Sequence, residues 1–157
     1  MKVKKHFIIL LSIFLFISCS DDSSSDNNID EPQNISITQE IHNLVNQHRK
    51  TLNKNELIFN DDVANIALDH TEYMISKNKI SHDGFDDRFT DLRSLVSAKS
   101  MAENVASKQR SAKEVVESWL NSSGHKKNIE GNYTHTGIGV KKNSDGIYYF
   151  TQLFYLE

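Results

Sequence analysis

The stretch that decides the fold is Val115-Val116-Glu117-Ser118-Trp119-Leu120-Asn121-Ser122-Ser123-Gly124-His125-Lys126-Lys127-Asn128-Ile129. It contains the only tryptophan of the 157-residue chain. Ser111 and Glu114, just before it, have the S-x-x-E spacing of a capping box, so a helix is predicted to begin there. Val115 and Trp119 form an i,i+4 apolar pair on this helix, which indicates a packed face.

Gly124 and His125 stand near the end of the stretch. Gly124 is predicted to end the helix, because glycine readily adopts the left-handed conformation found after a helix C-terminus. His125 would then lie on a turn that a packed helix holds in place. Such a position suits a histidine of a functional site, and it equally suits a histidine that caps or packs. Residues 126–130 are expected to add one more helical turn.

The first eighteen residues are predicted to be a lipoprotein signal peptide. Three lysines lie at positions 2, 4 and 5, and an apolar run over residues 7–17 follows, interrupted only by Ser12. This run is too short for a permanent membrane span and fits the apolar region of a signal peptide. Ser18 before Cys19 resembles a bacterial lipobox, in which the cysteine is acylated, with palmitate for example, after cleavage in front of it. The alternative is an ordinary secretory signal with an incidental cysteine.

Residues 19–35 are predicted to form a flexible acidic tether. They contain five acidic residues, no basic residue and the only proline. Such a segment cannot bury enough apolar surface to fold. Its start, Cys19-Ser20-Asp21-Asp22, resembles the export signal of surface lipoproteins in some Gram-negative bacteria; the alternative is a solvated linker. The expectation is an exported lipoprotein anchored in the outer membrane through Cys19, with cell-surface exposure as a further step.

The folded part, residues 36–157, is nearly neutral, with 15 basic and 16 acidic residues. A nucleic-acid partner would need a basic patch, so the charge balance argues against this class of partner. Cys19 is the only cysteine, and therefore the mature fold is expected to lack an intrachain disulfide.

The order of elements predicts an α+β fold. Helices are expected over residues 36–50 and 61–78, and strands over 134–140 and 147–155 with a hairpin at 143–146. The last strand has aromatic residues on both faces and is expected to be central. Residues 80–88 are interpreted as a polar loop and 92–96 as a short irregular helix. We therefore expect a small antiparallel sheet between helical layers, an α-β-α sandwich.

Individual polar residues allow two interpretations each. His48 and His70 fall on apolar helix faces, which favours hydrogen-bonded packing over a ligand role. His82 follows the second helix and, taken alone, is a surface histidine. Glu103 lies among apolar neighbours, so it is either exposed on an edge or partly buried beside a cationic or hydrogen-bond-donating partner.

Several motifs in order resemble the CAP superfamily, which comprises cysteine-rich secretory proteins, antigen 5, pathogenesis-related proteins and bacterial relatives. The resemblance covers about residues 38–155, which would form an SCP-like domain. Together with the predicted lipobox, the chain resembles a bacterial lipoprotein member of this superfamily. The motifs are Val45-Asn46-Gln47-His48-Arg49, Ser81-His82, Ala102-Glu103-Asn104-Val105-Ala106, the stretch from Trp119 to Ile129, Gly137-Ile138-Gly139-Val140 and Thr151-Gln152-Leu153-Phe154. The resemblance implies the same α-β-α sandwich.

The resemblance also implies a central cleft lined by two histidines and two acidic residues. Three of these match His82, Glu103 and His125, whereas Ser122 stands where the second acid is expected. Asn104 belongs to the same Glu-Asn motif. His82 and His125 are candidate ligands of a divalent cation such as zinc, and such a site should be weak, because zinc usually takes three or four protein ligands.

Three functional hypotheses remain. The first is a lipid-anchored protein that binds an extracellular lipid, glycan or protein through the His82/Glu103/His125 cleft. The second is a metal-assisted hydrolase of the peptidase or esterase type, in which Glu103 would be the catalytic residue. The third is a structural surface adhesin with a vestigial cleft.

Overall fold

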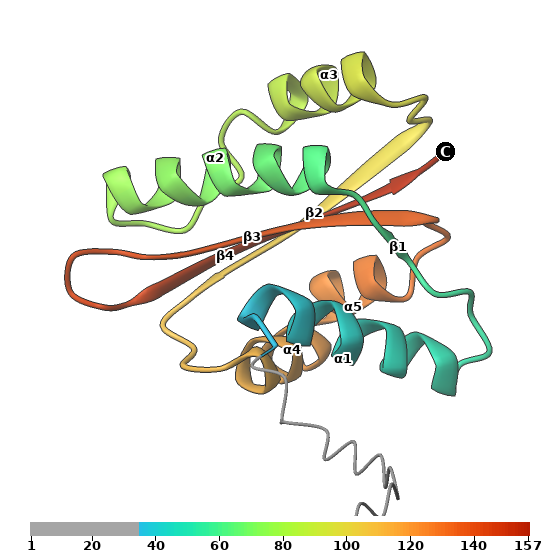
Figure 1. Ribbon diagram of the computed structural model, residues 1–157, viewed down its shortest axis with the longest axis horizontal. Helices are drawn as coiled ribbons and strands as arrows, with labels where there is room; N and C mark the ends of the chain where they lie inside the picture. Colours follow the sequence, from blue (N-terminus) through green and yellow to red (C-terminus); the bar gives the residue numbers. More distant parts are fainter. Residues whose placement is uncertain (1–34) are drawn as a thin grey trace, which may run out of the picture. The chain divides into compact units, whose positions relative to one another are not determined.

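The computed structural model describes residues 35–157, which form an α-β-α sandwich (Figure 1). Helices α2 and α3 cover one face of the sheet, and α1, α4 and α5 cover the other. The α+β sandwich expected from the sequence is confirmed. The elements are α1 (Ile37–Thr51), β1 (Ile58–Phe59), α2 (Asp61–Lys77), α3 (Phe85–Leu95), β2 (Ser100–Ser107), α4 (Ala112–Leu120), α5 (Ser123–Ile129), β3 (His135–Lys142) and β4 (Tyr148–Leu156).

The sheet has the strand order β1-β3-β4-β2. Strand β4 pairs antiparallel with β2 and with β3, as the predicted hairpin requires. It is central and buried on both faces, which confirms the expectation from its aromatic residues. The short β1 adds a parallel pair to β3, so the sheet is mixed and not wholly antiparallel.

The two long helices begin and end where the sequence signals place them. The Ser36 hydroxyl accepts a hydrogen bond from the Gln39 N–H, and the Asn60 side chain accepts one from Val63. Asn78 ends α2 in the left-handed conformation, with φ 50°. These side chains satisfy backbone groups that the first and last turns leave unpaired.

The predicted end of the tryptophan helix is wrong. Helix α4 ends at Leu120, and Gly124 lies inside α5 with an ordinary backbone conformation. The chain breaks at Ser122, which is extended, and its carbonyl then accepts the Lys126 N–H of the new helix. His125 therefore stands on a second helix and not on a turn.

Helix α3 is longer than the sequence indicated, because residues 85–88 are helical and not part of a loop. Gly84 precedes it with φ 71° and provides no side-chain cap. Asp86 and Asp87 in the first turn interact favourably with the helix dipole. Arg88 and Leu92, one turn apart, are the buried residues of this helix.

Alternate residues of β4 face opposite layers. Phe150 and Phe154 belong to the apolar cluster that also contains Trp119, whereas Leu153 packs with residues of α2 and α3 such as Val63. The two clusters together fix both helical layers on the sheet.

Helix α2 lies directly on the glycines of β3. A Cβ atom at Gly137 or Gly139 would meet the backbone of α2 at 2.4 or 2.3 Å, closer than side chains permit. Glycine is required at both positions for this close approach.

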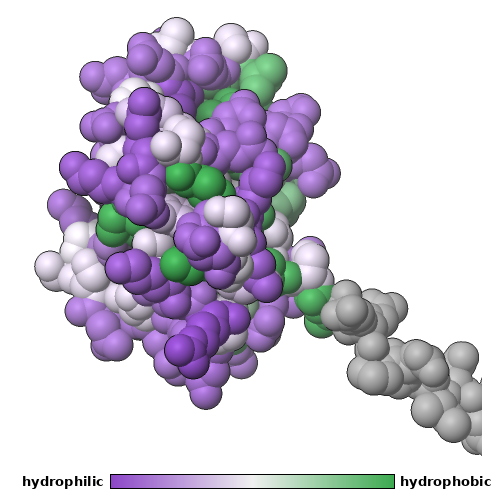
Figure 2. Space-filling view, turned by 90° about the vertical axis from the view of Figure 1, so that its left-hand side faces the viewer, coloured by the Kyte–Doolittle hydropathy of each residue, from purple (hydrophilic) through white to green (hydrophobic). Residues whose placement is uncertain are grey.

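The surface view in Figure 2 is mostly hydrophilic, with small and separate apolar patches. No helix within residues 35–157 is both long and apolar enough to cross a membrane. The predicted signal peptide, the predicted acylation site Cys19 and all but the last residue of the predicted tether lie outside the described residues.

Candidate functional site

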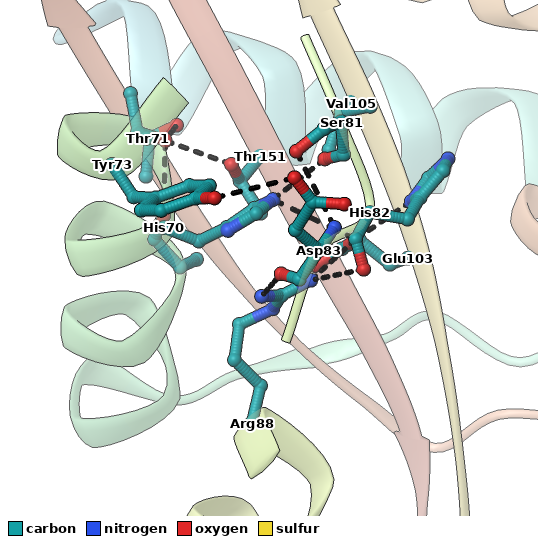
Figure 3. A network of polar contacts seen from close by, with 12 residues as sticks. His70, Thr71, Tyr73, Ser81, His82, Asp83, Arg88, Glu103, Val105 and Thr151 are labelled. Carbon is teal, nitrogen blue, oxygen red and sulfur yellow. Dashed lines mark hydrogen bonds and ion pairs between the residues drawn. The ribbon is translucent and has the colours of Figure 1, made fainter. Parts of the chain in front are cut away.

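Glu103 is the centre of a buried polar network on β2 (Figure 3). Its side chain is 1% exposed, and the strand also buries Ala102, Val105 and the polar Asn104. The carboxylate accepts hydrogen bonds on both oxygens, from His82 and from Arg88. Of the two interpretations left open by the sequence, the buried carboxylate with a cationic partner is confirmed.

Arg88 compensates the buried charge of Glu103. Its Nε lies 2.7 Å from Glu103 Oε2 and its Nη2 lies 2.8 Å from Oε1, a bidentate pair. The same guanidinium donates to the carbonyl of Asp83. Because a carboxylate buried without a partner is costly, Arg88 is what permits Glu103 to occupy this strand. Figure 3 shows it reaching from α3 toward the loop that contains His82.

His82 connects this buried pair to solvent. Its Nδ1 donates to Glu103 Oε1 at 2.7 Å, while its side chain is 54% exposed. An ionised carboxylate only accepts, so a proton lies on Nδ1, and in the neutral ring the outer Nε2 is left as an acceptor. The sequence alone suggests a free surface histidine, whereas the structure holds this ring in one orientation.

His70 holds the same loop from the α2 side. Its Nε2 donates to the carbonyl of Ser81 at 2.8 Å, and its ring stacks on Tyr73 with a centroid separation of 5.8 Å. Burial lowers the pKa of His70 despite the nearby Glu103 carboxylate, so the ring is neutral near pH 7. The predicted hydrogen-bonded core histidine is confirmed.

Asn104 and Asn128 join β2 to α5 on the other side of the sheet. Asn128 Nδ2 donates to Asn104 Oδ1 at 2.9 Å and to the Glu103 carbonyl at 3.1 Å. Asn104, fully buried, donates to the carbonyl of His125 at 3.2 Å. The Glu-Asn motif therefore has two separate roles: Glu103 orients His82, and Asn104 positions the helix of His125.

His125 is half-buried on α5. Its pKa is lowered, first by burial and then by the nearby His82 imidazole, so the ring stays neutral at pH 7. Ser122 precedes α5 and makes no side-chain capping bond. Of the predicted site residues, the structure links His82 with Glu103 and ties Asn104 to the backbone of His125. Ser122 has no described bond to this network.

Arg88, His70 and Asn128 belong to the network, but the sequence analysis did not assign them to the site. The buried Glu103 requires a cation, and a helix over 85–95 would have placed Arg88 and Leu92 on one inner face. These two signals together would have pointed to Arg88.

A pocket of about 400 Å³ between α2 and α3 is lined in part by His70 and Arg88.

The sequence of this chain matches a family model over residues 42–154, that of CAP, the cysteine-rich secretory protein family. The match covers most of the chain. This chain belongs to the CAP family. The recurrence of the fold in solved structures agrees, so the resemblance seen in the motifs is confirmed.

The relatives of this CAP domain include extracellular bacterial proteins. An extracellular SCP-domain protein from Bacillus anthracis has 30% identity and a TM-score of 0.68, over 77% of this chain and 40% of that chain. An outer surface protein from Borrelia burgdorferi has 24% identity and a TM-score of 0.69, over 78% and 96%. The latter likeness shows the fold alone.

Two curated proteins of Bacillus subtilis also match the CAP domain. The uncharacterized protein YkwD is 33% identical over 61% of this chain and 39% of its own length. The uncharacterized membrane protein YlbC is 32% identical over 63% of this chain and 28% of its own length. This chain therefore spans less than two fifths of the length of each.

Proposed function

We propose that this protein is an exported, lipid-anchored CAP-domain protein that binds a ligand or partner through the exposed imidazole of His82 and the neighbouring His125. The observation that supports this most is the bond from His82 to a carboxylate that is itself almost fully buried. Glu103 is a positioning residue in this proposal, because it acts through His82.

The energetics of the network support a role beyond stability. Burying a carboxylate and a guanidinium costs free energy, which their mutual attraction offsets only when the geometry is good. Apolar residues in the same place often give a fold of equal or greater stability. Here the pair keeps one exposed ring in a fixed tautomer and orientation. A fixed ring loses less rotational freedom on binding a ligand than a free one.

The proposed ligands of a weakly held divalent cation such as zinc are His82 and His125. The Glu103–His82 bond has the arrangement in which a carboxylate orients a metal-binding histidine and leaves Nε2 free. The lowered pKa of His125 favours the neutral ring that binds metals. Within residues 35–157 no group of three or more His, Cys, Asp or Glu side chains could hold a metal ion. Water or a ligand group would therefore complete the coordination.

The contacts of Glu103 favour binding over hydrolysis. A general base needs an oxygen that can reach its proton donor, but both oxygens of this carboxylate are engaged by Arg88 or His82. When bound, a metal could supply an activated water. Glu103 would then contribute only by orienting His82.

Export and anchoring rest on the first residues. The apolar run over residues 7–17 and the Ser18-Cys19 pair support a cleaved and acylated lipoprotein. The extracellular protein from B. anthracis and the membrane protein from B. subtilis show that similar domains occur outside the cytoplasm or at membranes. Incorporation of a fatty-acid analogue tests the anchor, and label that persists in Cys19→Ser would refute it.

Calorimetric titration with zinc tests the site. We expect His82→Ala and His125→Ala each to weaken zinc binding at least about tenfold, since each removes one of two ligands. His42→Ala is the matched control, because His42 bonds to the Leu57 carbonyl beside β1, at the opposite edge of the sheet from β2 and Glu103. Unchanged binding in both site variants would rule out the metal site. Ester or peptide turnover that persists in Glu103→Gln would exclude Glu103 as a catalytic base.

A further inference from the structure

A second pocket, of about 440 Å³, is lined by residues of the β2–α4 connection and of the β3–β4 hairpin. The connection from β2 to α4 provides Lys108 and Arg110, the end of β3 provides Lys142, and the start of β4 provides Tyr148. The Lys108 N–H donates to the Tyr148 carbonyl at 3.0 Å, which fixes the connection against the β3–β4 hairpin. In Figure 1 the hairpin and this connection lie at the same end of the sheet.

The lining of this pocket includes three cationic side chains and no carboxylate. Within residues 35–157 no acidic group lies within 4 Å of the charged nitrogens of Lys108, Arg110 or Lys142, whereas the adjacent Lys141 pairs with Glu72. The Lys142 Nζ instead lies 4.5 Å from the centroid of the Tyr148 ring. Asp145, in the hairpin, is not among the lining residues. The Glu114 carboxylate accepts the Arg110 backbone N–H at 2.8 Å but is not among the lining residues, so the excess of positive charge belongs to the lining itself.

The backbone of Lys108 adds a second observation. Its φ is 82°, a left-handed conformation that costs a non-glycine residue free energy and that glycine adopts without strain. Asn53 and Asn78, the other such residues among positions 35–157, are of a type that tolerates it. Glycine would relieve the backbone strain at position 108, but it would remove a positive charge from the pocket.

We propose that this pocket binds a phosphate group, with Lys108, Arg110 and Lys142 as its cationic ligands. Arginine and lysine side chains commonly bind phosphate in proteins, arginine through a bidentate fork and lysine as a point charge. Tyr148 and Ile147 provide an apolar wall for the organic part of a phosphate ester. The phosphate group could belong to a soluble ester or to an anionic lipid headgroup. This site is separate from His82 and His125 and does not depend on their function.

Titration of the full chain with pyrophosphate tests the proposal. We expect Arg110→Ser and Lys142→Ser each to weaken binding about tenfold, and binding by the parent to weaken as salt is raised. The matched control is Lys113→Ser, which removes one exposed charge from α4, where the partner of Lys113 within residues 35–157 is Glu117. Zinc binding should not change in any of these variants. Equal pyrophosphate binding by the parent and both pocket variants would overturn the proposal.

Lys108→Gly separates binding from folding. This variant removes the backbone strain together with the charge, so its melting temperature should stay the same or rise while pyrophosphate binding falls. A general loss of structure would lower both. Retained pyrophosphate binding in Lys108→Gly would exclude Lys108 from the site.

Vesicles distinguish the two sources of phosphate. Co-sedimentation with phosphatidylglycerol vesicles, relative to phosphatidylcholine vesicles, is compared between the parent and Arg110→Ser/Lys142→Ser. Loss of the phosphatidylglycerol preference in the variant supports a lipid headgroup. Loss of pyrophosphate binding without an effect on vesicles supports a soluble ester. No effect in either measurement refutes the pocket.

Discussion

Two arginines are buried in this domain, and they have opposite surroundings. Arg49, 2% exposed, donates to four backbone carbonyls, those of Asn55, Ile129, Gly131 and Tyr133. Arg88, 8% exposed, donates to both oxygens of the Glu103 carboxylate. One guanidinium therefore meets only neutral acceptors, and the other meets a full negative charge.

The difference separates a residue that holds the fold from one that holds the site. Arg49 joins the end of α1 to the chain segments before β1 and after α5, and burial lowers its pKa because no anion balances it. Arg88 joins α3 to β2, but its partner Glu103 also holds the exposed His82. Loss of Arg49 should therefore affect stability alone, and loss of Arg88 should affect stability and the site.

The largest expected effect is that of Arg49→Met. The change leaves four carbonyls without their donor, one buried and three partly buried, so the free energy of unfolding should fall by about 4 kcal/mol. Chemical denaturation measures this. Arg93→Met, at an exposed position on α3, is the control and should stay within about 0.5 kcal/mol of the parent. A loss of less than about 1 kcal/mol in Arg49→Met would contradict the assigned role.

Arg88→Met should have the next largest effect, about 3 kcal/mol, because it leaves Glu103 buried without a compensating charge. The double variant Arg88→Met/Glu103→Gln should recover part of this loss. Zinc binding should weaken in Arg88→Met, because Glu103 would no longer be fixed to orient His82. Arg49→Met, measured below its melting temperature where it is folded, should bind zinc as the parent does. Additive effects of the two substitutions in the double variant would argue against the pairing.

His70→Gln should have a smaller and pH-dependent effect. Because the folded pKa of His70 is lowered, the unfolded chain holds more protons from about pH 6.5 down to the folded pKa. The parent should therefore lose stability as pH falls through this window. Glutamine keeps a donor for the Ser81 carbonyl but does not titrate, so the loss between pH 7.5 and 5 should be smaller in the variant. An identical pH dependence would show that His70 does not contribute.

Lys141→Ala should have the smallest effect. Lys141 and Glu72 form an ion pair in which both side chains are about half exposed. Solvent screens such pairs, and removal should change the free energy of unfolding by no more than about 0.5 kcal/mol. Thermal denaturation at low and high salt measures this change. A loss of unfolding free energy in Lys141→Ala as large as that in Arg88→Met would contradict the assumption that burial makes the two arginines more important than surface charges.

The elements that the sequence predicted well are those with strong local signals. Ser36 and Asn60 cap α1 and α2 through their own side chains, and the β3–β4 hairpin has a turn of asparagine, aspartate and glycine. Helix α3 was largely missed because Gly84 begins it without a side-chain cap and its first turn is polar. The end of α4 was misplaced because Gly124 was interpreted as a helix stop, whereas the break is at Ser122.

The site was predictable only in part. The family motifs point to His82, Glu103 and His125, and the structure joins the first two directly. Arg88 and Asn128 were missed because their contacts depend on how α3 and α5 pack against β2, which periodicity does not specify. The binding and metal roles of the histidines remain predictions.

The contact between α2 and the glycines of β3 has a consequence for mechanical precision. Where backbone rests on backbone, the spacing of two layers has almost no tolerance, because no side chain can rotate to absorb a displacement. Gly139 lies against Ala67 and Leu68, less than one turn before His70. The His70 ring bonds the Ser81 carbonyl, so this backbone-to-backbone contact also sets the position of the His82 loop relative to the sheet.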